Sequence, residues 1–115
     1  MRVGEAMKYP VRSNPDTFAM RIQLHALQSK MAGEFGSEAF ALLSVIVLTE
    51  DRLRYSRAPR FRLYDLMDFT GLGRRKLLDV RDRLVEAGWL TVVQSSDGSP
   101  CAYWVNVPGG EASLP

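Results

Sequence analysis

The sequence predicts a mainly α-helical domain with a small β-hairpin. Its 115 residues are the usual size of a single domain. Before Gly88, apolar residues recur every three or four positions, which is the spacing of helices that bury one face. After Gly88, β-branched and aromatic residues alternate in two short runs on either side of an Asp-Gly turn signal, a pattern typical of paired strands.

An additional N-terminal helix is predicted over residues 14–33, after a flexible arm of residues 1–13. Asn14-Pro15-Asp16 is a helix start signal, and Gly33 marks the expected end of the helix. Four apolar residues at spacings of 4, 3 and 4 form one seam, namely Met20, Leu24, Leu27 and Met31. This seam either closes over the core of its own chain or joins two copies of the chain into a homodimer.

The next predicted element is a central, buried helix. Ser37 is a favourable helix cap, and the run Ala39–Leu53 is apolar on almost every side without an intervening Gly or Pro. A basic connector, Arg54–Arg60, follows this helix, and Arg60–Arg62 has the character of a short strand. We therefore expect the run Ala39–Leu53 to form the centre of the core.

Two more helices are predicted beyond the connector. The segment Leu63–Phe69 has the length of a two-turn helix, and Thr70–Gly73 has the length of a tight turn. The segment Arg74–Ala87 is predicted to form a longer helix, which ends at Gly88. Gly71 supplies the turn position that needs a positive φ. Four apolar residues of the longer helix are expected on its buried side: Leu77, Val80, Leu84 and Val85.

The predicted hairpin has strands at Trp89–Gln94 and Cys101–Val107, joined by a loop over Ser95–Pro100. That loop contains no Lys or Arg. Residues 108–115 are expected to form a frayed C-terminal tail.

The composition excludes several classes of protein. Hydrophobic residues make up 46% of the chain and charged residues 24%, which is the balance of a soluble globular domain. The chain has one Cys and one His, so it can form neither an internal disulfide nor a His/Cys metal cage. The longest apolar run is about half of the ~20 residues that a membrane span needs. We expect a cytoplasmic protein with no membrane segment, no metal and no cofactor.

Positive charge is concentrated in the middle of the chain. Residues 52–83 contain ten basic and four acidic residues, a net charge of +6, within a chain whose net charge is only +2. The remaining residues contain five basic and nine acidic residues. A basic segment between acidic ends is typical of a protein that binds an anionic partner, although a solvated helix face with paired charges would give the same count.

The predicted order of helix, short strand, two helices and two strands resembles the winged helix-turn-helix superfamily. The likeness lies in residues 63–72, Leu-Tyr-Asp-Leu-Met-Asp-Phe-Thr-Gly-Leu, and in residues 77–90, which end in Leu-Val-Glu-Ala-Gly-Trp-Leu. It covers residues 37–107. Two positions depart from the pattern: Met67 stands where many members have Ala, and Gly73 where a Ser or Thr cap is commoner. The resemblance implies sequence-specific or structure-specific binding of double-stranded DNA, in transcription regulation or in phage or plasmid replication initiation.

The resemblance also suggests which residues contact DNA, because the second helix of this motif lies in the major groove with its N-terminal residues nearest the bases. Arg75, Lys76 and Asp79 are then candidates for base edges. Arg74 and Arg83 of the same helix are the candidates for phosphate contacts. The spaced arginines of the connector, Arg57, Arg60 and Arg62, form a second candidate surface for the DNA backbone, unless they serve only the solubility of the protein. The loop of the hairpin has no basic residue, so we expect little or no contact with the minor groove.

The composition of the first turn of the longer helix argues for a bound anionic ligand. Positive charge there opposes the helix macrodipole and costs about 0.3–1 kcal/mol for each exposed residue. A bound phosphate would offset this cost at residues 74–76. The same outward face of this helix also has three acidic residues: Asp79, Asp82 and Glu86. They argue against a bound phosphate, because they would repel it and could instead pair with Arg75 and Arg83 at i,i+4.

Two alternatives stay open. The acidic residues of this helix and a hairpin loop without bases would also fit a winged-helix module that binds another protein, and an RNA-binding winged helix is the other alternative. The sequence lacks a phosphate-binding loop of the GxxxxGK[ST] type, and His25 has no acid or nucleophile partner nearby in sequence. We therefore expect no catalytic residue and no enzyme activity.

Overall fold

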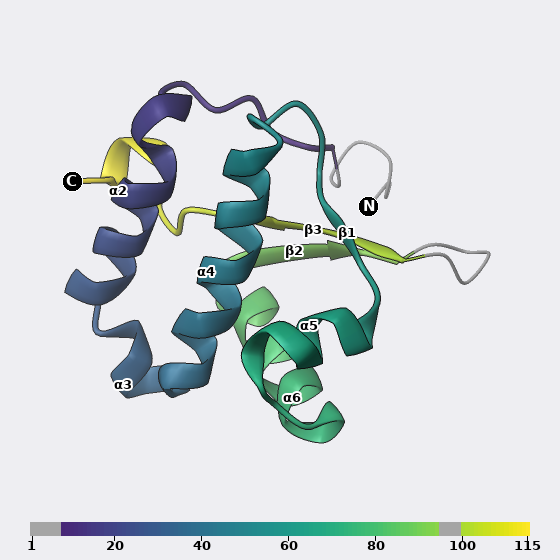
Figure 1. The fold of residues 1–115 in the computed structure, drawn as a ribbon. Helices are drawn as coiled ribbons and strands as arrows, with labels where there is room; N and C mark the ends of the chain where they lie inside the picture. The colour runs from purple at the N-terminus through teal and green to yellow at the C-terminus, as the bar shows by residue number, and fades with distance from the viewer. Residues whose placement is uncertain (1–7, 95–99) are drawn as a thin grey trace.

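The computed structural model describes residues 8–94 and 100–115. Over these residues the chain is mainly helical and contains a three-stranded antiparallel sheet (Figure 1). The elements in chain order are α2 (Pro15–Gln28), α3 (Met31–Phe35), α4 (Ser37–Arg52), β1 (Arg60–Phe61), α5 (Leu63–Thr70), α6 (Arg74–Glu86), β2 (Leu90–Val93), β3 (Cys101–Val105) and a short 3₁₀ helix (Glu111–Ser113). None of the helices in the described part of the chain is long and apolar enough to cross a bilayer.

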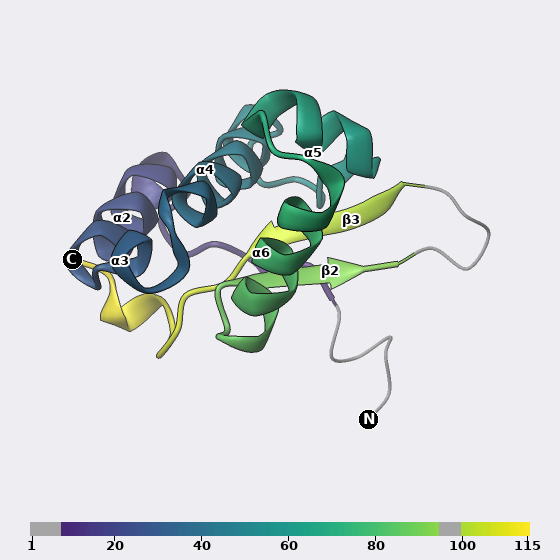
Figure 2. The ribbon, with the colours of Figure 1, turned by 90° about the horizontal axis from the view of Figure 1, so that it is seen from below.

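Helix α4 occupies the centre of the fold, with α2 and α3 on one side and α5 and α6 on the other (Figure 1). The sheet packs against α4 and α6, so that the helices form one layer and the strands a second (Figure 2). Leu42, Leu43, Ile46 and Val47 of α4 are fully buried. The expectation of a central, buried helix over this run is confirmed, because α2, α3, α5, α6 and β3 all pack against it, although Leu48 is 52% exposed.

The N-terminal helix differs from the prediction in length. Helix α2 ends at Gln28, and Lys30 adopts a left-handed backbone with φ 57° that reverses the chain. Gly33, the predicted end, lies inside α3. The chain turns before Gly33 because Met31, which is 1% exposed, packs into the core from the start of a separate helix.

The buried face of α2 is also not the predicted one. Its core residues are Phe18, Ile22 and Ala26, all fully buried. The predicted seam is instead mostly on the surface, with Met20 63%, Leu24 41% and Leu27 57% exposed, while Met31 is buried. Both sets have helical spacing, and the face that carries the aromatic and β-branched side chains buries more apolar area.

The two helices beyond the connector form as predicted. Helix α5 ends at Gly71, whose φ is 73°, and α6 is followed by Gly88, whose φ is 88°. Leu66 of α5 and Leu77 of α6 are fully buried between the helices. One prediction on α6 is wrong: Val85 is 40% exposed, because Leu84 fills the core at that turn.

The sheet has the order β1-β3-β2, with both pairs antiparallel. The short strand β1 is confirmed, and it pairs with the start of β3 through Phe61 and Cys101. The predicted hairpin is present as β2 and β3, with Leu90 opposite Val105. The predicted loop falls largely on residues 95–99, which lie outside the described residues.

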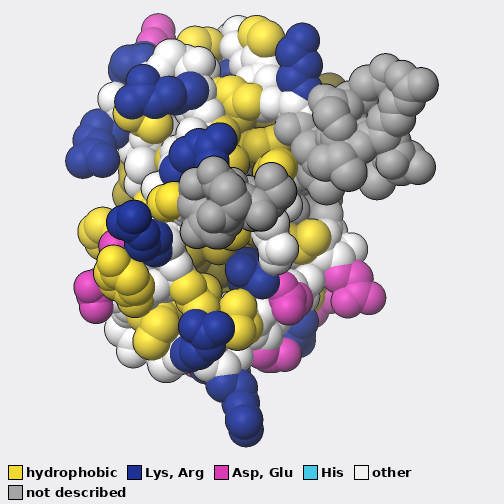
Figure 3. All heavy atoms as spheres, turned by 90° about the vertical axis from the view of Figure 1, so that its right-hand side faces the viewer, with side chains coloured by type: hydrophobic (Ala, Val, Ile, Leu, Met, Phe, Trp, Pro, Cys, Tyr) yellow, Lys and Arg dark blue, Asp and Glu magenta, His cyan; other side chains and the backbone are white. Residues whose placement is uncertain are grey.

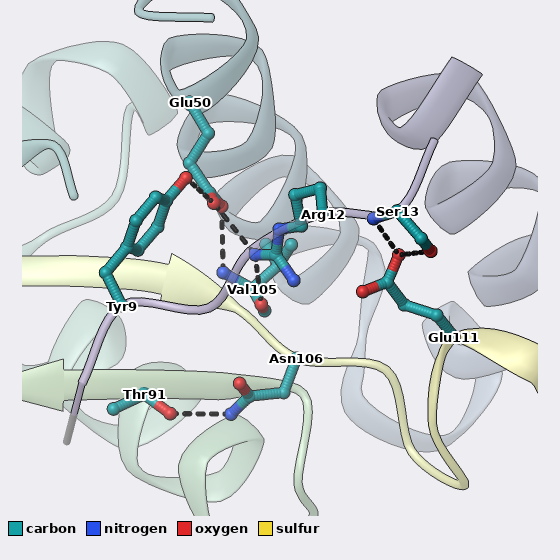
Figure 4. A network of polar contacts seen from close by, with 8 residues as sticks. All are labelled: Tyr9, Arg12, Ser13, Glu50, Thr91, Val105, Asn106 and Glu111. Carbon is teal, nitrogen blue, oxygen red and sulfur yellow. Dashed lines mark hydrogen bonds and ion pairs between the residues drawn. The ribbon is translucent and has the colours of Figure 1, made fainter. Parts of the chain in front are cut away.

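The described parts of the two chain ends pack against the domain, in contrast to the predicted flexible arm and frayed tail. The Arg12 guanidinium, 3% exposed, forms an ion pair with Glu50 of α4 and donates a second hydrogen bond to the carbonyl of Val105 (Figure 4). At the other end, Leu114 is 8% exposed, and a Glu111 carboxylate oxygen accepts hydrogen bonds from Ser13. The described parts of both ends, residues 8–13 and 108–115, therefore belong to the folded unit, and residues 1–7 of the predicted arm lie outside the described residues.

Candidate nucleic-acid interface

The first turn of α6 presents three exposed cations, Arg74, Arg75 and Lys76. Helix α6 begins at Arg74, its N-cap Gly73 provides no side-chain hydrogen bond, and its first turn contains no acidic residue. Within residues 8–94 and 100–115, none of the three cations forms an ion pair. The positive end of the helix dipole, equivalent to about half a charge, adds to these three formal charges.

A groove lies between this end of α6 and the hairpin, and we call it the hairpin groove. Its volume is about 380 Å³, and three arginines line it: Arg62, just before α5, and Arg74 and Arg81, both on α6. Tyr103 of β3 contributes to the wall. The groove can therefore accept an anion along one wall and an aromatic or apolar group along the other.

Arg81 is the fixed member of the hairpin groove. Its Nη1 donates to the Tyr103 hydroxyl oxygen at 3.4 Å, and its Nε donates to a carboxylate oxygen of Asp82 at 3.1 Å. Burial raises the pKa of Tyr103, while the Arg81 guanidinium opposes that rise. Tyr103 therefore remains a neutral phenol at physiological pH, and the charge of Arg81 is only partly balanced there by the exposed carboxylate of Asp82.

A second hollow, which we call the connector pocket, lies where the connector meets α4 and α5. Its volume is about 480 Å³, and its lining includes Arg52, Arg57, Arg60, Asp65 and Phe69. Phe61 lines both hollows, so the connector pocket and the hairpin groove are neighbours. Figure 3 shows Lys and Arg side chains spread widely over this side of the molecule, with a group of Asp and Glu side chains towards its lower right and others at its left edge and top.

The structure separates one predicted site residue from the others. Arg83, expected to contact phosphate, lies against α3: its Nη2 donates to the carbonyl of Glu34 at 3.3 Å, and its guanidinium lies 5.4 Å from the centre of the Phe35 ring. The remaining predicted residues are all exposed: Arg57, Arg60, Arg62, Arg74, Arg75, Lys76 and Asp79. The pairing of Asp79 or Glu86 with Arg83, or of Asp79 with Arg75, is not formed in the described part of the chain.

Arg81 was not among the predicted site residues, although the sequence contains a signal for it. Arg74 and Arg81 are seven positions apart, which is two turns of an α-helix, so they share one face of α6. The contact of Arg81 with Tyr103 joins residues 22 positions apart, and no local pattern indicates it.

The described residues contain no group of three or more His, Cys, Asp or Glu side chains placed to hold a metal ion. The His25 ring lies 5.5 Å from the Trp89 ring and packs as an aromatic group. Cys101 is half-buried in β3 and lines the hairpin groove.

Comparison with protein-family models, with curated proteins and with solved structures finds no match for this chain.

Proposed function

We propose that this protein is a winged helix-turn-helix protein that binds double-stranded DNA. In this assignment α5 and α6 are the two helices of the motif, α6 is the recognition helix, and the hairpin of β2 and β3 is the wing. The order from α4 to β3 supports the assignment, as does Gly71 at the turn with its positive φ. The role that fits is transcription regulation or replication initiation.

The observation that carries the proposal is the charge at the start of α6. Arg74, Arg75 and Lys76 are exposed at an uncapped helix end, where they destabilise the free protein. A phosphate at this position would interact with the cations, with the free backbone N–H groups and with the helix dipole at once. A DNA backbone supplies such phosphates on both sides of the major groove.

The acidic residues of α6 restrict how the helix can approach DNA. Asp79, Asp82 and Glu86 lie further along the exposed surface of α6, where they would repel phosphates. The helix therefore enters the groove by its N-terminal turn rather than lying along it. The hairpin groove and the connector pocket then lie beside the entry point, and their arginines bind the flanking backbone.

The test is a salt series on duplex DNA, with the sequence first chosen by selection from a random library. The logarithm of the affinity should fall linearly with the logarithm of the salt concentration, with a slope of about −0.9 for each phosphate contacted. Five or six contacts would give a slope of about −5. Absence of duplex binding at about 50 mM salt would overturn the proposal. Tighter binding to hairpin RNA than to the selected duplex would replace it with the RNA-binding alternative.

One observation favours a second function, binding of another protein. The acidic surface of α6 formed by Asp79, Asp82 and Glu86 would suit a basic partner. Binding of such a partner should be lost when these three residues are substituted by Asn or Gln. The same substitutions should strengthen the binding of DNA, because they remove repulsion of phosphate.

A homodimer is the oligomeric state that fits the surface of α2. Met20, Leu24 and Leu27 are exposed and form one apolar row at i, i+4 and i+7, which we call the α2 row. An antiparallel pair of such helices about a two-fold axis would place Met20 of one copy opposite Leu27 of the other. Met31 is buried in its own chain and takes no part in this surface.

A further inference from the structure

The connector pocket has the size and position of a small-ligand site. It is bounded by the C-terminal turn of α4, by the connector, by β1 and by α5. Its volume of about 480 Å³ falls within the range of about 300–1,000 Å³ that is usual for small-molecule sites. In the proposed DNA complex, the residues that read bases lie on α6 and do not line this pocket.

The charge of the pocket favours an anion. Three of its lining residues are cationic, Arg52, Arg57 and Arg60, and the acidic one is Asp65. The C-terminal end of α4 adds about half a negative charge, so the lining keeps a net positive charge of about 1.5. No ion pair of the three arginines is present in the described ranges 8–94 and 100–115.

Two of the polar groups are held in fixed positions. Arg60 donates from Nη1 to the carbonyl oxygen of Pro100 at 3.1 Å, which holds its side chain beside the hairpin. Asp65 accepts the backbone N–H of Arg62 at 3.0 Å through Oδ2. Its second carboxylate oxygen accepts no hydrogen bond from the described residues and can accept one from a ligand hydroxyl or amino group.

An aromatic ring at the pocket is exposed to solvent. Phe69 is 66% exposed, although it is a large apolar residue on a helix with a buried face. Its ring stands nearly perpendicular to that of Phe61, at 83° and with centroids 6.4 Å apart, and Phe61 is itself buried. Phe69 is therefore held by its edge contact with Phe61, and its ring is available for stacking.

We propose that the connector pocket binds a single unpaired nucleotide. The arginines bind its phosphate, and its base stacks on Phe69, since an exposed ring next to a cationic hollow matches the two parts of a nucleotide. The nucleotide is either free in solution or the unpaired residue of a DNA strand that leaves the duplex beside α6. The chemistry of recognition is the same in both cases.

The first experiment titrates the intact protein with adenosine 5′-monophosphate, adenosine and inorganic phosphate, followed by calorimetry and by amide chemical shifts. The monophosphate should bind saturably and more tightly than either of its parts. Phe69→Ala should weaken binding by about fivefold to a hundredfold, the usual contribution of one base–aromatic stack. Arg57→Met should weaken binding of the monophosphate and of inorganic phosphate alike, but not that of adenosine.

The matched control is Arg54→Met. Arg54 belongs to the same connector, but its guanidinium pairs with Asp16 and Asp51 and does not line the pocket. This variant loses the same charge as Arg57→Met and should bind the monophosphate as the parent protein does. An equal loss in both variants would show a general charge effect and would overturn the proposal, as would a lack of saturable binding up to about 10 mM monophosphate, since a specific site of this kind should have a Kd well below that.

The second experiment distinguishes the two sources of the nucleotide. A blunt duplex is compared with the same duplex carrying a single-stranded overhang. If the nucleotide belongs to the DNA, the overhang should tighten binding, Phe69→Ala should remove that gain, and binding of the blunt duplex should be unchanged by the substitution. If the nucleotide is free, the overhang should make no difference while the monophosphate still binds. Failure of duplex binding with retained monophosphate binding would contradict only the proposed DNA-binding function.

Discussion

Arg12 and Glu50 form an ion pair at 2.8 Å in the interior of the domain, where their side chains are 3% and 0% exposed. The carboxylate of Glu50 also accepts hydrogen bonds from the hydroxyl of Tyr9 at 2.7 Å and from the backbone N–H of Val105 at 2.9 Å (Figure 4). Burial raises the pKa of Glu50, and the positive charge of Arg12, with the hydrogen bonds from Arg12, Val105 and Tyr9, opposes that rise. The pair joins the N-terminal segment, α4 and β3.

Substitution of Arg12→Met should lower the free energy of unfolding by about 3–5 kcal/mol at neutral pH, because it leaves a buried carboxylate without its partner. Loss of Arg12 raises the pKa of Glu50 further, so the folded variant binds the Glu50 proton more tightly than the unfolded chain does. The penalty is therefore absent at low pH and grows as pH rises through the folded pKa. Urea unfolding should show a smaller difference from the parent at about pH 5 than at about pH 8.

The control for this prediction is Arg54→Met, which breaks an ion pair on the surface. The side chain of Arg54 is 58% exposed, and its partners are Asp16 and Asp51. The free energy of unfolding should change by about 0–1 kcal/mol, since exposed pairs are screened by water and salt. A loss as large as that of Arg12→Met would mean that burial does not decide the strength of the pair.

Substitutions at the two ends of α6 should have opposite effects on stability. Arg75→Glu replaces a cation with an anion near the positive end of the helix dipole and should raise the free energy of unfolding by about 0.3–1 kcal/mol. Arg83→Glu, in the last turn, makes the same change of charge near the negative end and also removes the contact with Phe35. It should lower stability, as measured by thermal unfolding.

The same two variants should differ in their affinity for DNA. Arg75→Glu should abolish binding of the selected duplex, while Arg83→Glu should weaken it less, because Arg83 lies against α3 rather than beside Arg74. Fluorescence anisotropy at fixed salt measures both. Equal losses would indicate that only the net charge of the protein matters for binding.

Substitutions in the α2 row should weaken association of the chain into a dimer but should not change its folding stability. Leu27→Gln should change the free energy of unfolding by less than about 0.5 kcal/mol at protein concentrations where the chain is monomeric, because the side chain is already 57% exposed. Ile22→Ala, on the opposite, fully buried face of the same helix, should cost about 2–5 kcal/mol. Sedimentation equilibrium should show a dimer for the parent and a monomer for Leu27→Gln. A monomeric parent at high concentration would dismiss the dimer.

Two glycines at the turn before α6 should respond to substitution with opposite signs. A side chain at Gly71 or Gly73 meets no atom within 4 Å, so the backbone alone decides the outcome. Gly71→Ala should destabilise the protein by about 1–2 kcal/mol, because its φ of 73° is unfavourable for any residue with a Cβ. Gly73→Ser should stabilise it by roughly 0.3 kcal/mol, since the extended backbone of Gly73 suits an N-cap and Ser adds the missing hydrogen bond.

Local patterns in the sequence were sufficient to identify α5, α6, β2 and β3, although they placed Val85 of α6 on the wrong side of its helix. Period and glycine position identify α5, α6 and the turn between them, because Gly71 and Gly88 take the backbone conformations that end helices. The exposure of residues 74–76 also follows from the period of α6. These features depend on residues within a few positions of one another.

Local patterns do not determine which face of α2 is buried. Ile22 and Leu24 both belong to rows with helical spacing, and an isolated helix does not determine which row meets α4. The buried ion pair is more distant still, since Arg12 and Glu50 are 38 positions apart and Arg12 and Val105 are 93 apart. An arginine in an irregular segment gives no sign that it will be buried.

The bond from Arg12 to Val105 also has a consequence for synthesis of the chain. During translation the N-terminal segment leaves the ribosome long before β3, so Arg12 and Glu50 can meet while the acceptor that completes their arrangement is still absent. Native contacts over such a separation form late and slow the final folding step. Nascent chains that stop before residue 101 should therefore remain sensitive to protease, and protection should appear only after Val105 has emerged.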